Sequence, residues 1–388
     1  MWTKKDVVLV EVITEPYQKA LVEQRFEELE ELVTTYGGCT VVHTVQQRAK
    51  PDYKTYVWSG KLEEIKDEML ARGARLLVIG NIMKPQQIYN VNEYMRKFWL
   101  EARDRVDLIL NIFERHATTT EAKLQIELAA IKHMWPRIFG MWMELSRQWA
   151  TGGGWSGAAR WLGETNVEIM KRHLAKRERQ IQQELKNYEH VRATHRHARK
   201  RSALPVVGLV WYTNAWKSSL MRALTNEDVY IADKLFATLG THVSDIYFPR
   251  RDGKGEKVLL NDTIGFIRDL PPQLIQAFSS TLEDSIESDI LLHVIDVSDP
   301  LRDDKIQVVD EILDHIGAQQ PRYYIFNKTD LVSQLEIAQL QRVYRDLPTC
   351  WISTMKGEGI DQVKQLIAHH LIGEQLDDEW YLQHMTLS

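Results

Sequence analysis

Two polar stretches, each following an apolar run, could bind phosphates. The first, WYTNAWKS at residues 211–218, follows the run PVVGLV. It resembles the phosphate loop G-x-x-x-x-G-K-[ST], with Trp211 and Trp216 at the two glycine positions. In such a loop Lys217 would contact the β- and γ-phosphates, and the Ser218 hydroxyl would bind Mg²⁺. Because both glycines are missing, this stretch alone also fits an ordinary turn between a strand and a helix.

The second stretch is DTIG at residues 262–265, which follows the apolar run KVLLN. Asp262 could hold Mg²⁺ through a water molecule, and the Gly265 amide could reach a γ-phosphate. D-x-x-G is common by chance, so it is informative only together with its neighbours. Between the two stretches, LFATL offers Thr238 as a further ligand for Mg²⁺.

The third stretch, NKTD at residues 327–330, is specific for one base. The Asp330 carboxylate could accept both N–H donors on the Watson–Crick edge of guanine, which adenine lacks. A site built around such hydrogen bonds rejects the wrong base on the order of 10⁴-fold. Lys328 would pack over the base, and Asn327 would join the base loop to the phosphate loop. The alternative is a surface turn after a strand.

A fourth stretch, Ser353 to Met355, follows TCWI and could place a backbone amide against the guanine O6. The order of the stretches predicts a guanine nucleotide site and disfavours an ATPase. The predicted nucleotide-binding residues are Trp211, Tyr212, Thr213, Asn214, Ala215, Trp216, Lys217, Ser218, Phe236, Ala237, Thr238, Asp262, Thr263, Ile264, Gly265, Asn327, Lys328, Thr329, Asp330, Ser353, Thr354 and Met355. Among them, Lys217, Thr238 and Gly265 are the catalytic candidates, and Ser218 and Thr238 are the metal ligands.

The elements that must position these residues follow from the hydrophobic pattern. Apolar runs alternate with helical patterns at both ends of the chain, which indicates two α/β domains. The central part contains two long helical patterns joined by the glycine-rich loop TGGGWSG. We therefore predict an N-terminal α/β domain (1–117), a basic helical hairpin (118–203), a P-loop domain with a doubly wound mixed sheet (204–372) and a C-terminal tail (373–388).

The second helical pattern of the hairpin carries an excess of basic residues. This could be a solvated helix face, or it could contact nucleic acid. The candidate contacts in the loop and the helix are Gly153, Gly154, Arg160, Lys171, Arg172, Lys176 and Arg177.

Composition bounds the class of protein. The net charge of −5 means that a basic footprint must be local, and 44% hydrophobic with 27% charged residues is ordinary for a globular protein. The two cysteines, Cys39 and Cys350, form neither a disulfide framework nor a metal cluster. Because no apolar run approaches 18 residues, we expect no membrane span, and the cytoplasm is the expected location.

The chain resembles the HflX-type GTPases, which are ribosome-associated proteins. The likeness lies in YTNAWKSSLMRALT, LLNDTIGFIRDLP and FNKTDL, and, upstream, in DLILNIFERHA, EAKLQIELA, GMWMELSRQ and LGET. The resemblance implies GTP as substrate, Mg²⁺ as cofactor, and binding to the large ribosomal subunit with the hairpin loop aimed at ribosomal RNA. It also implies splitting or rescue of stalled ribosomes. A monomer is expected.

One departure from GTPases in general is Phe266, which stands after Gly265 where many of them have a glutamine that positions water. Phe266 cannot orient water by hydrogen bonding. Intrinsic hydrolysis should therefore be slow and should need a partner. The resembled family has the same apolar feature.

A second departure concerns tryptophan. The chain has 12 tryptophans and only 20 glycines in 388 residues, about 5% glycine against an average of about 7%. Trp58, Trp161, Trp211 and Trp216 stand where the family has glycine, and Trp155 lies inside the glycine-rich loop. An indole at 211 or 216 would occupy phosphate space or force strained dihedrals.

Two hypotheses account for these tryptophans. In the first, UGA codons have been translated as tryptophan although the source organism decodes them as glycine, and the protein is an ordinary GTPase. In the second, the tryptophans are genuine, and the protein is a ribosomal-RNA-binding scaffold that has lost nucleotide binding.

Overall fold

The structure is a computed structural model, and it describes residues 5–14, 19–117, 119–133, 169, 171–190, 204–212, 217–225, 242–249, 255–262, 265–268 and 288–373. The chain forms two compact units. One comprises Met1–Tyr188 with Asp269–Ala277, and the other comprises Glu189–Arg268 with Phe278–Ser388. Among the described residues, no helix is both long and apolar enough to cross a bilayer.

The first unit contains a four-stranded parallel sheet in the order β2-β1-β3-β4. The strands are β1 (Lys5–Ile13), β2 (Gly38–Gln47), β3 (Leu76–Ile79) and β4 (Glu101–Asp104). The first three coincide with the apolar runs, so the predicted small parallel α/β fold is confirmed. Strand β4 was not expected, because its sequence EARD is short and mostly charged.

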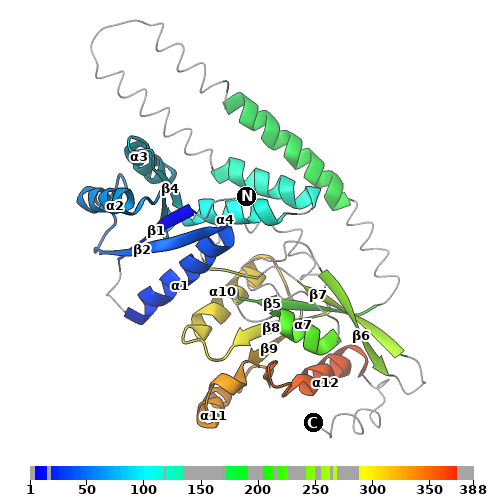
Figure 1. The fold of residues 1–388 in the computed structure, drawn as a ribbon. Coiled ribbons are helices and arrows are strands. Elements are labelled where there is room, and N and C mark those ends of the chain that lie inside the picture. Colours follow the sequence, from blue (N-terminus) through cyan, green and yellow to red (C-terminus); the bar gives the residue numbers. More distant parts are fainter. Residues whose placement is uncertain are drawn as a thin grey trace, which may run out of the picture. The chain divides into compact units, whose positions relative to one another are not determined.

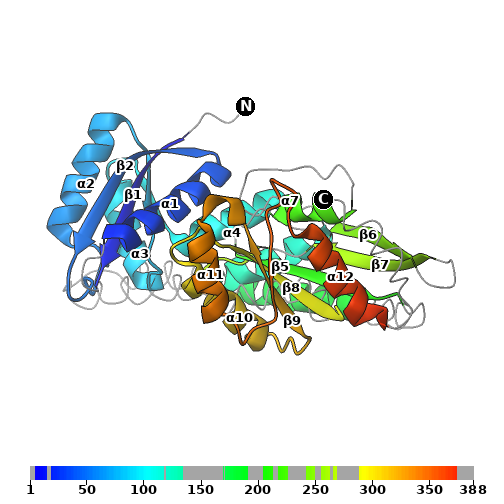
Figure 2. The ribbon, with the colours of Figure 1, turned by 90° about the horizontal axis from the view of Figure 1, so that it is seen from below.

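Helices cover both faces of this sheet. They are α1 (Lys19–Tyr36), α2 (Ser59–Arg72), α3 (Pro85–Arg96) and α4 (Arg105–His116). Alternate β1 residues Val8, Val10 and Val12 share a core cluster with apolar residues of α2 and α3. Helices α1 and α4 contact each other. Figure 2 shows α1 and α2 on opposite sides of strands β1 and β2.

Residues 120–133 and 171–190 are helical, as the hairpin prediction requires. Leu124, Leu128 and Ile131 pack on Ile181, which is fully buried. The loop between the helices lies outside the described residues.

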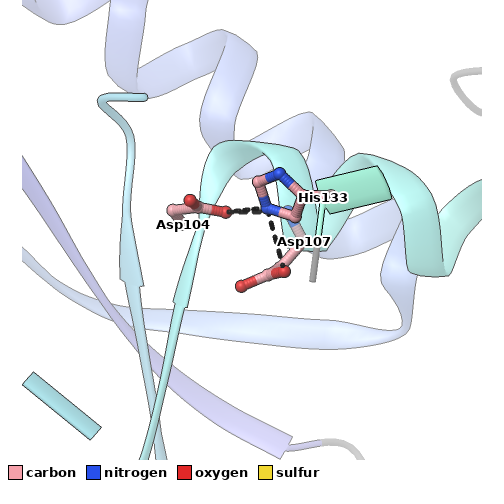
Figure 3. Close-up of side chains that lie close together, drawn as sticks. All are labelled: Asp104, Asp107 and His133. Carbon is pink, nitrogen blue, oxygen red and sulfur yellow. Dashed lines mark hydrogen bonds and ion pairs between the residues drawn. The ribbon is translucent and has the colours of Figure 1, made fainter. Parts of the chain in front are cut away.

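A histidine and two aspartates connect the first of these helices to α4. His133 Nε2 lies 3.8 Å from Asp104 Oδ1 and 3.5 Å from Asp107 Oδ1, as Figure 3 shows. Asp104 is fully buried and caps α4, because its side chain accepts a hydrogen bond from the Asp107 amide. These contacts link the helix to the N-terminal α/β part of its unit.

The second unit contains a six-stranded sheet in the order β10-β9-β8-β5-β7-β6. The strands are β5 (Val206–Trp211), β6 (His242–Pro249), β7 (Gly255–Asp262), β8 (Ile290–Asp296), β9 (Arg322–Asn327) and β10 (Thr349–Trp351). All neighbours pair in parallel except β6, which is antiparallel to β7. The predicted mixed sheet is confirmed.

Helices pack on both faces of this sheet. Helices α7 (Lys217–Thr225) and α12 (Ile360–Leu371) share one apolar core with β5 to β10, and α10 (Arg302–His315) and α11 (Gln334–Val343) share another with β8 and β9. Figure 1 shows α10 on one side of the sheet and α7 and α12 on the other. The unit is therefore doubly wound, as the sequence predicted.

Candidate nucleotide-binding site

The predicted nucleotide loops follow parallel strands that end at one edge of the sheet. In the strand register, Leu209 of β5 lies opposite Asp262 of β7, and Asp296 of β8 lies opposite Asn327 of β9. Strand β5 has β7 on one side and β8 on the other, so the strand order switches direction at β5. Open α/β sheets bind ligands outside the carboxyl ends of their strands at such a switch point. The phosphate-loop stretch begins at this position.

Asn327 joins two of the loops. Its side chain is fully buried, and Oδ1 accepts hydrogen bonds from the Lys328 amide (2.8 Å) and the Thr354 amide (3.1 Å). The NKTD loop and the Ser353–Met355 stretch are thereby held together. The Nδ2 atom is buried and finds no acceptor among the residues that the structure describes. Its predicted contact with the phosphate loop stays a prediction, because residues 213–216 lie outside the described residues.

Asp330 is held by a serine from the neighbouring loop. The Ser353 hydroxyl donates to Asp330 Oδ1 at 2.5 Å and accepts from the Lys356 amide at 3.2 Å. Ser353 is fully buried, so its hydroxyl has little freedom to turn away. A carboxylate oxygen has more than one lone pair, so Asp330 can still accept from a base. The contact therefore sets the direction of the carboxylate without occupying it.

Lys328 occupies a left-handed backbone conformation, with φ 66° and ψ 35°. Its Nζ lies 2.5 Å from Asp296 Oδ2 at the end of β8. Asp296 is itself fixed, because its Oδ1 accepts from the Ser298 amide (3.0 Å) and hydroxyl (2.6 Å). Asp296 is not among the site residues predicted from the sequence. The available signal was an aspartate that ends the buried run ILLHVI and is followed two residues later by serine.

At the phosphate end, the segment after β7 is attached to the segment after β5. The Phe266 amide donates to the Trp211 carbonyl at 2.8 Å, and the Arg268 amide donates to the Tyr212 hydroxyl at 2.9 Å. Phe266 is buried, with 2% of its surface exposed. Phe266, which follows Gly265, therefore has its apolar ring in a fixed, buried position.

The expectation of strain at Trp211 is wrong. Trp211 lies in β5, pairs in register with Val294, and has an ordinary strand conformation. Its indole is 6% exposed and packs in the apolar core with residues of α7, such as Leu220. The core accepts the ring, so no strained dihedral is needed at this position. Trp216 lies outside the described residues.

Comparison with known proteins fits this geometry. Three family models match: GTP-binding GTPase N-terminal over residues 23–114, GTP-binding GTPase Middle Region over 116–199, and 50S ribosome-binding GTPase over 206–328. The GTPase HflX of Caldanaerobacter subterraneus subsp. tengcongensis is 38% identical over 373 residues, which cover 96% of this chain and 82% of that protein. The GTPase HflX of Escherichia coli is 36% identical, over 90% of this chain and 79% of that protein.

The chain belongs to the HflX family of GTPases. The resemblance inferred from the motifs is confirmed, and with it the assignment of the chain to a family of GTPases. Among solved structures, the complex of SsGBP with GDP covers 96% of this chain and 100% of its own, with a TM-score of 0.54 at 24% identity. That likeness shows the fold alone.

Several predicted site residues of this HflX-family chain fall outside the described residues. They are Thr213, Asn214, Ala215, Trp216, Phe236, Ala237, Thr238, Thr263 and Ile264, together with the loop residues Gly153, Gly154 and Arg160. Lys217 and Ser218 begin α7 directly after the phosphate loop, and Asp262 ends β7. Their backbones have the predicted positions, whereas their side chains are not described. Their roles stay predictions.

In the basic helix, one arginine has a partner within the hairpin. Arg177 donates from Nε and Nη2 to the two carboxylate oxygens of Glu127, each at 2.7 Å. This hydrogen-bonded pair with Glu127 raises the pKa of Arg177. Arg172 and Lys176 are exposed, whereas Lys171 is half-buried. Arg177 therefore holds the two helices together, and the exposed basic residues are better placed to meet an outside partner.

Proposed function

We propose that this HflX-family GTPase binds GTP–Mg²⁺ at the carboxyl edge of its second sheet and acts on the large ribosomal subunit. Its task there would be to split or rescue stalled ribosomes. The observation that carries the proposal is the base loop, in which Ser353 holds Asp330 and Asn327 bridges to Thr354. The ribosomal part is supported by the matching family model, which describes a 50S ribosome-binding GTPase. We further propose a monomer in the cytoplasm.

The donor set fits magnesium. Ser218, Thr238 and Asp262 would offer two hydroxyls and a carboxylate, and Mg²⁺ prefers hard oxygen ligands together with phosphate oxygens. The start of α7, which carries Ser218, follows β5, and Asp262 ends the adjacent strand. The bound ion would neutralise charge on the β- and γ-phosphates. Lys217 would add a fixed cation, and the Gly265 amide would contact the γ-phosphate.

Phe266 makes us expect slow GTP hydrolysis by the free protein. Because its buried ring cannot hydrogen-bond to water, the attacking water must be positioned by another group. We propose that the large ribosomal subunit stabilises the arrangement that supplies it. Unassisted hydrolysis would then be about 10⁻³ s⁻¹ or slower, by analogy with other unassisted GTPases.

Substitution of Asp330 tests the nucleotide site. Asp330→Asn should weaken GTP binding by about 10²-fold or more and favour xanthosine triphosphate, whose carbonyl at C2 accepts from the new amide. The control is Asp346→Asn, which changes an aspartate of the same unit whose side chain is 86% exposed. Unchanged GTP affinity of Asp330→Asn would refute the assignment of this loop.

A scaffold without nucleotide binding is the second candidate. This candidate is favoured because the Trp211 ring is buried in the apolar core. Titration of the printed sequence against its Trp211→Gly/Trp216→Gly variant separates the two functions. If the natural protein is a GTPase with glycines at these sites, the variant should bind GTP–Mg²⁺ and the printed sequence should not. Failure of both proteins to bind would favour the scaffold.

A further inference from the structure

Helix α3 ends in a conformation that tryptophan rarely adopts. Trp99, three residues after the end of the helix, has φ 62°. The left-handed region places Cβ against the following carbonyl, which is unfavourable for every residue except glycine and is an outlier for a bulky side chain. The side chain is 92% exposed, so packing does not compensate for this conformation.

The hydrogen bonds around Trp99 define a Schellman motif. The Trp99 amide donates to the Arg96 carbonyl (3.1 Å), and the next amide, Leu100, donates to the Met95 carbonyl (3.2 Å). Leu100 and Met95 are both buried, which supplies the apolar contact typical of this motif. The residue at the left-handed position is usually glycine.

Two other helix ends of this chain repeat the motif with glycine. After α2, Gly73 (φ 71°) donates to Leu70 and Ala74 donates to Met69. After α10, the bonds run from Gly317 (φ 78°) to Asp314 and from Ala318 to Leu313. The donors and acceptors have the same spacing at all three ends. The three motifs differ in the residue at the left-handed position, and only α3 has a side chain there.

In the part of the chain that the structure describes, the two other non-glycine residues with positive φ have compensating contacts. Tyr56 (φ 64°) exchanges two backbone hydrogen bonds with Asp52 and packs against the core of the first unit. Lys328 (φ 66°) forms its ion pair with Asp296. For Trp99, no side-chain hydrogen bond or ring contact with any residue that the structure describes is found. Trp58 and Trp211 have negative φ, so among these tryptophans the backbone demands glycine only at 99.

We infer that residue 99 is glycine in the natural protein, encoded by a UGA codon that its source decodes as glycine. Residue 99 follows a helix of the N-terminal α/β part, in the unit that does not contain the nucleotide site. Decay of an unused nucleotide site therefore gives no reason for tryptophan at this position, whereas a reassigned codon does. The inference rests on backbone geometry and is independent of the proposed ribosomal function.

The first test compares codons 99 and 351. Trp351 has the contacts of a genuine tryptophan, because its ring stacks on Phe326 with centroids 4.3 Å apart and its Nε1 donates to Thr349 Oγ1 at 3.1 Å. We expect UGA at 99 and UGG at 351, and peptides of the native protein with the mass of glycine at 99 and of tryptophan at 351. A UGG codon at 99, or a tryptophan mass there, overturns the inference.

The second test uses the full chain and does not depend on the source organism. Trp99→Gly should raise Tm by about 2–5 °C, because it removes the steric penalty at the left-handed position. Trp99→Ala keeps a Cβ and should gain clearly less, which separates conformation from mere removal of an exposed ring. The matched reverse change, Gly73→Trp, should lower Tm. Equal Tm for Trp99→Gly and Trp99→Ala, or no gain from Trp99→Gly, overturns the conformational argument.

Discussion

At the scale of single residues, one hydroxyl fixes the carboxylate to which we assign base selection. Asp330 needs a fixed direction if both N–H donors of guanine are to reach its carboxylate together. The Ser353 hydroxyl supplies this direction through its 2.5 Å contact with Oδ1. Ser353 itself does not need to touch the base for this purpose, so it is a positioning residue.

Loss of this hydroxyl should loosen guanine binding. Ser353→Ala should lower GTP affinity roughly tenfold, because a hydrogen bond to a charged group is worth about 1.5–3 kcal/mol. Selectivity for GTP over ATP should fall in the same titration. The control is Ser333→Ala, which removes the N-cap of α11 in the same unit. The control should reduce stability by about 1 kcal/mol and leave selectivity unchanged. Equal selectivity of the two variants would contradict the positioning role.

A buried histidine should make the second unit sensitive to acid. His293 in β8 is 1% exposed, and burial, with a smaller contribution from the positive charge of Arg322, lowers its pKa to about 3. The unfolded chain takes up this proton near pH 6.5, whereas the folded chain does not, so stability falls as the pH falls below 6.5. Between pH 7.5 and pH 5 the loss should be about 2 kcal/mol.

Urea unfolding across this pH range tests the assignment. On going from pH 7.5 to pH 5, the free energy of unfolding of His293→Gln should fall by about 2 kcal/mol less than that of the parent. His315→Gln changes an exposed histidine of α10 in the same unit and should follow the parent. A parent whose stability does not change between these pH values would show that His293 accepts a proton without unfolding.

At the scale of elements, sequence pattern predicted the strands that contain an apolar run and missed β4 and β6, two of the four edge strands. The run ILLHVID became β8, whose first six residues are all buried. Strand β6, at the antiparallel edge of the sheet, was not predicted. Its inward residues include Ser244, and its outward ones include Val243 (51% exposed) and Tyr247 (65% exposed), so hydrophobicity does not alternate with burial.

In the candidate site, too, some features could be predicted from the sequence and others could not. The motif NKTD and the stretch Ser353–Met355 could be located from residue types, because their chemistry depends on short fixed spacings. The contact of Lys328 with Asp296 and that of Ser353 with Asp330 could not be predicted, because they join residues 32 and 23 positions apart in the chain. Such contacts depend on strand order, which hydrophobic periodicity does not specify.

Strand β5 has little room at its centre. A Cβ on Gly208 would lie 2.6 Å from Ser288 Oγ and 2.8 Å from Leu291 Cδ2. Gly208→Ala should therefore destabilise the second unit by about 1–3 kcal/mol in urea unfolding, because the packed neighbours must move. Gly255→Ala in β7 is the matched control, since its nearest contact would be an ordinary 3.5 Å. Similar losses for both variants would mean that the neighbours of Gly208 yield easily.

At the scale of the whole molecule, charge is distributed unevenly along a chain whose net charge is −5. The helix 171–190 concentrates basic residues, and Arg177 is engaged with Glu127. Arg172, Lys176 and Arg179 are exposed on the same helix. RNA binding depends mainly on contacts between basic side chains and phosphates, and these contacts weaken as salt rises. If the helix binds ribosomal RNA, these three side chains should therefore account for the salt dependence of the interaction.

Reversal of these three charges tests the ribosomal interaction in the intact protein. Arg172→Glu, Lys176→Glu and Arg179→Glu together should weaken binding to large ribosomal subunits. The slope of the logarithm of the binding constant against the logarithm of the salt concentration should become shallower by up to about three, one for each lost phosphate contact. GTP affinity should not change, since the nucleotide site lies in the other unit. Stimulation of hydrolysis by the subunits should fall with binding, while turnover of the free protein stays at about 10⁻³ s⁻¹ or below. The matched control reverses Arg72, Arg96 and Lys97, three exposed charges of the N-terminal α/β part. The surface ion pairs of Arg72 with Glu68 and of Arg96 with Glu93 are worth little. If the helix variant binds subunits as well as this control does, the basic helix is a solvated face and the ribosome must be contacted elsewhere.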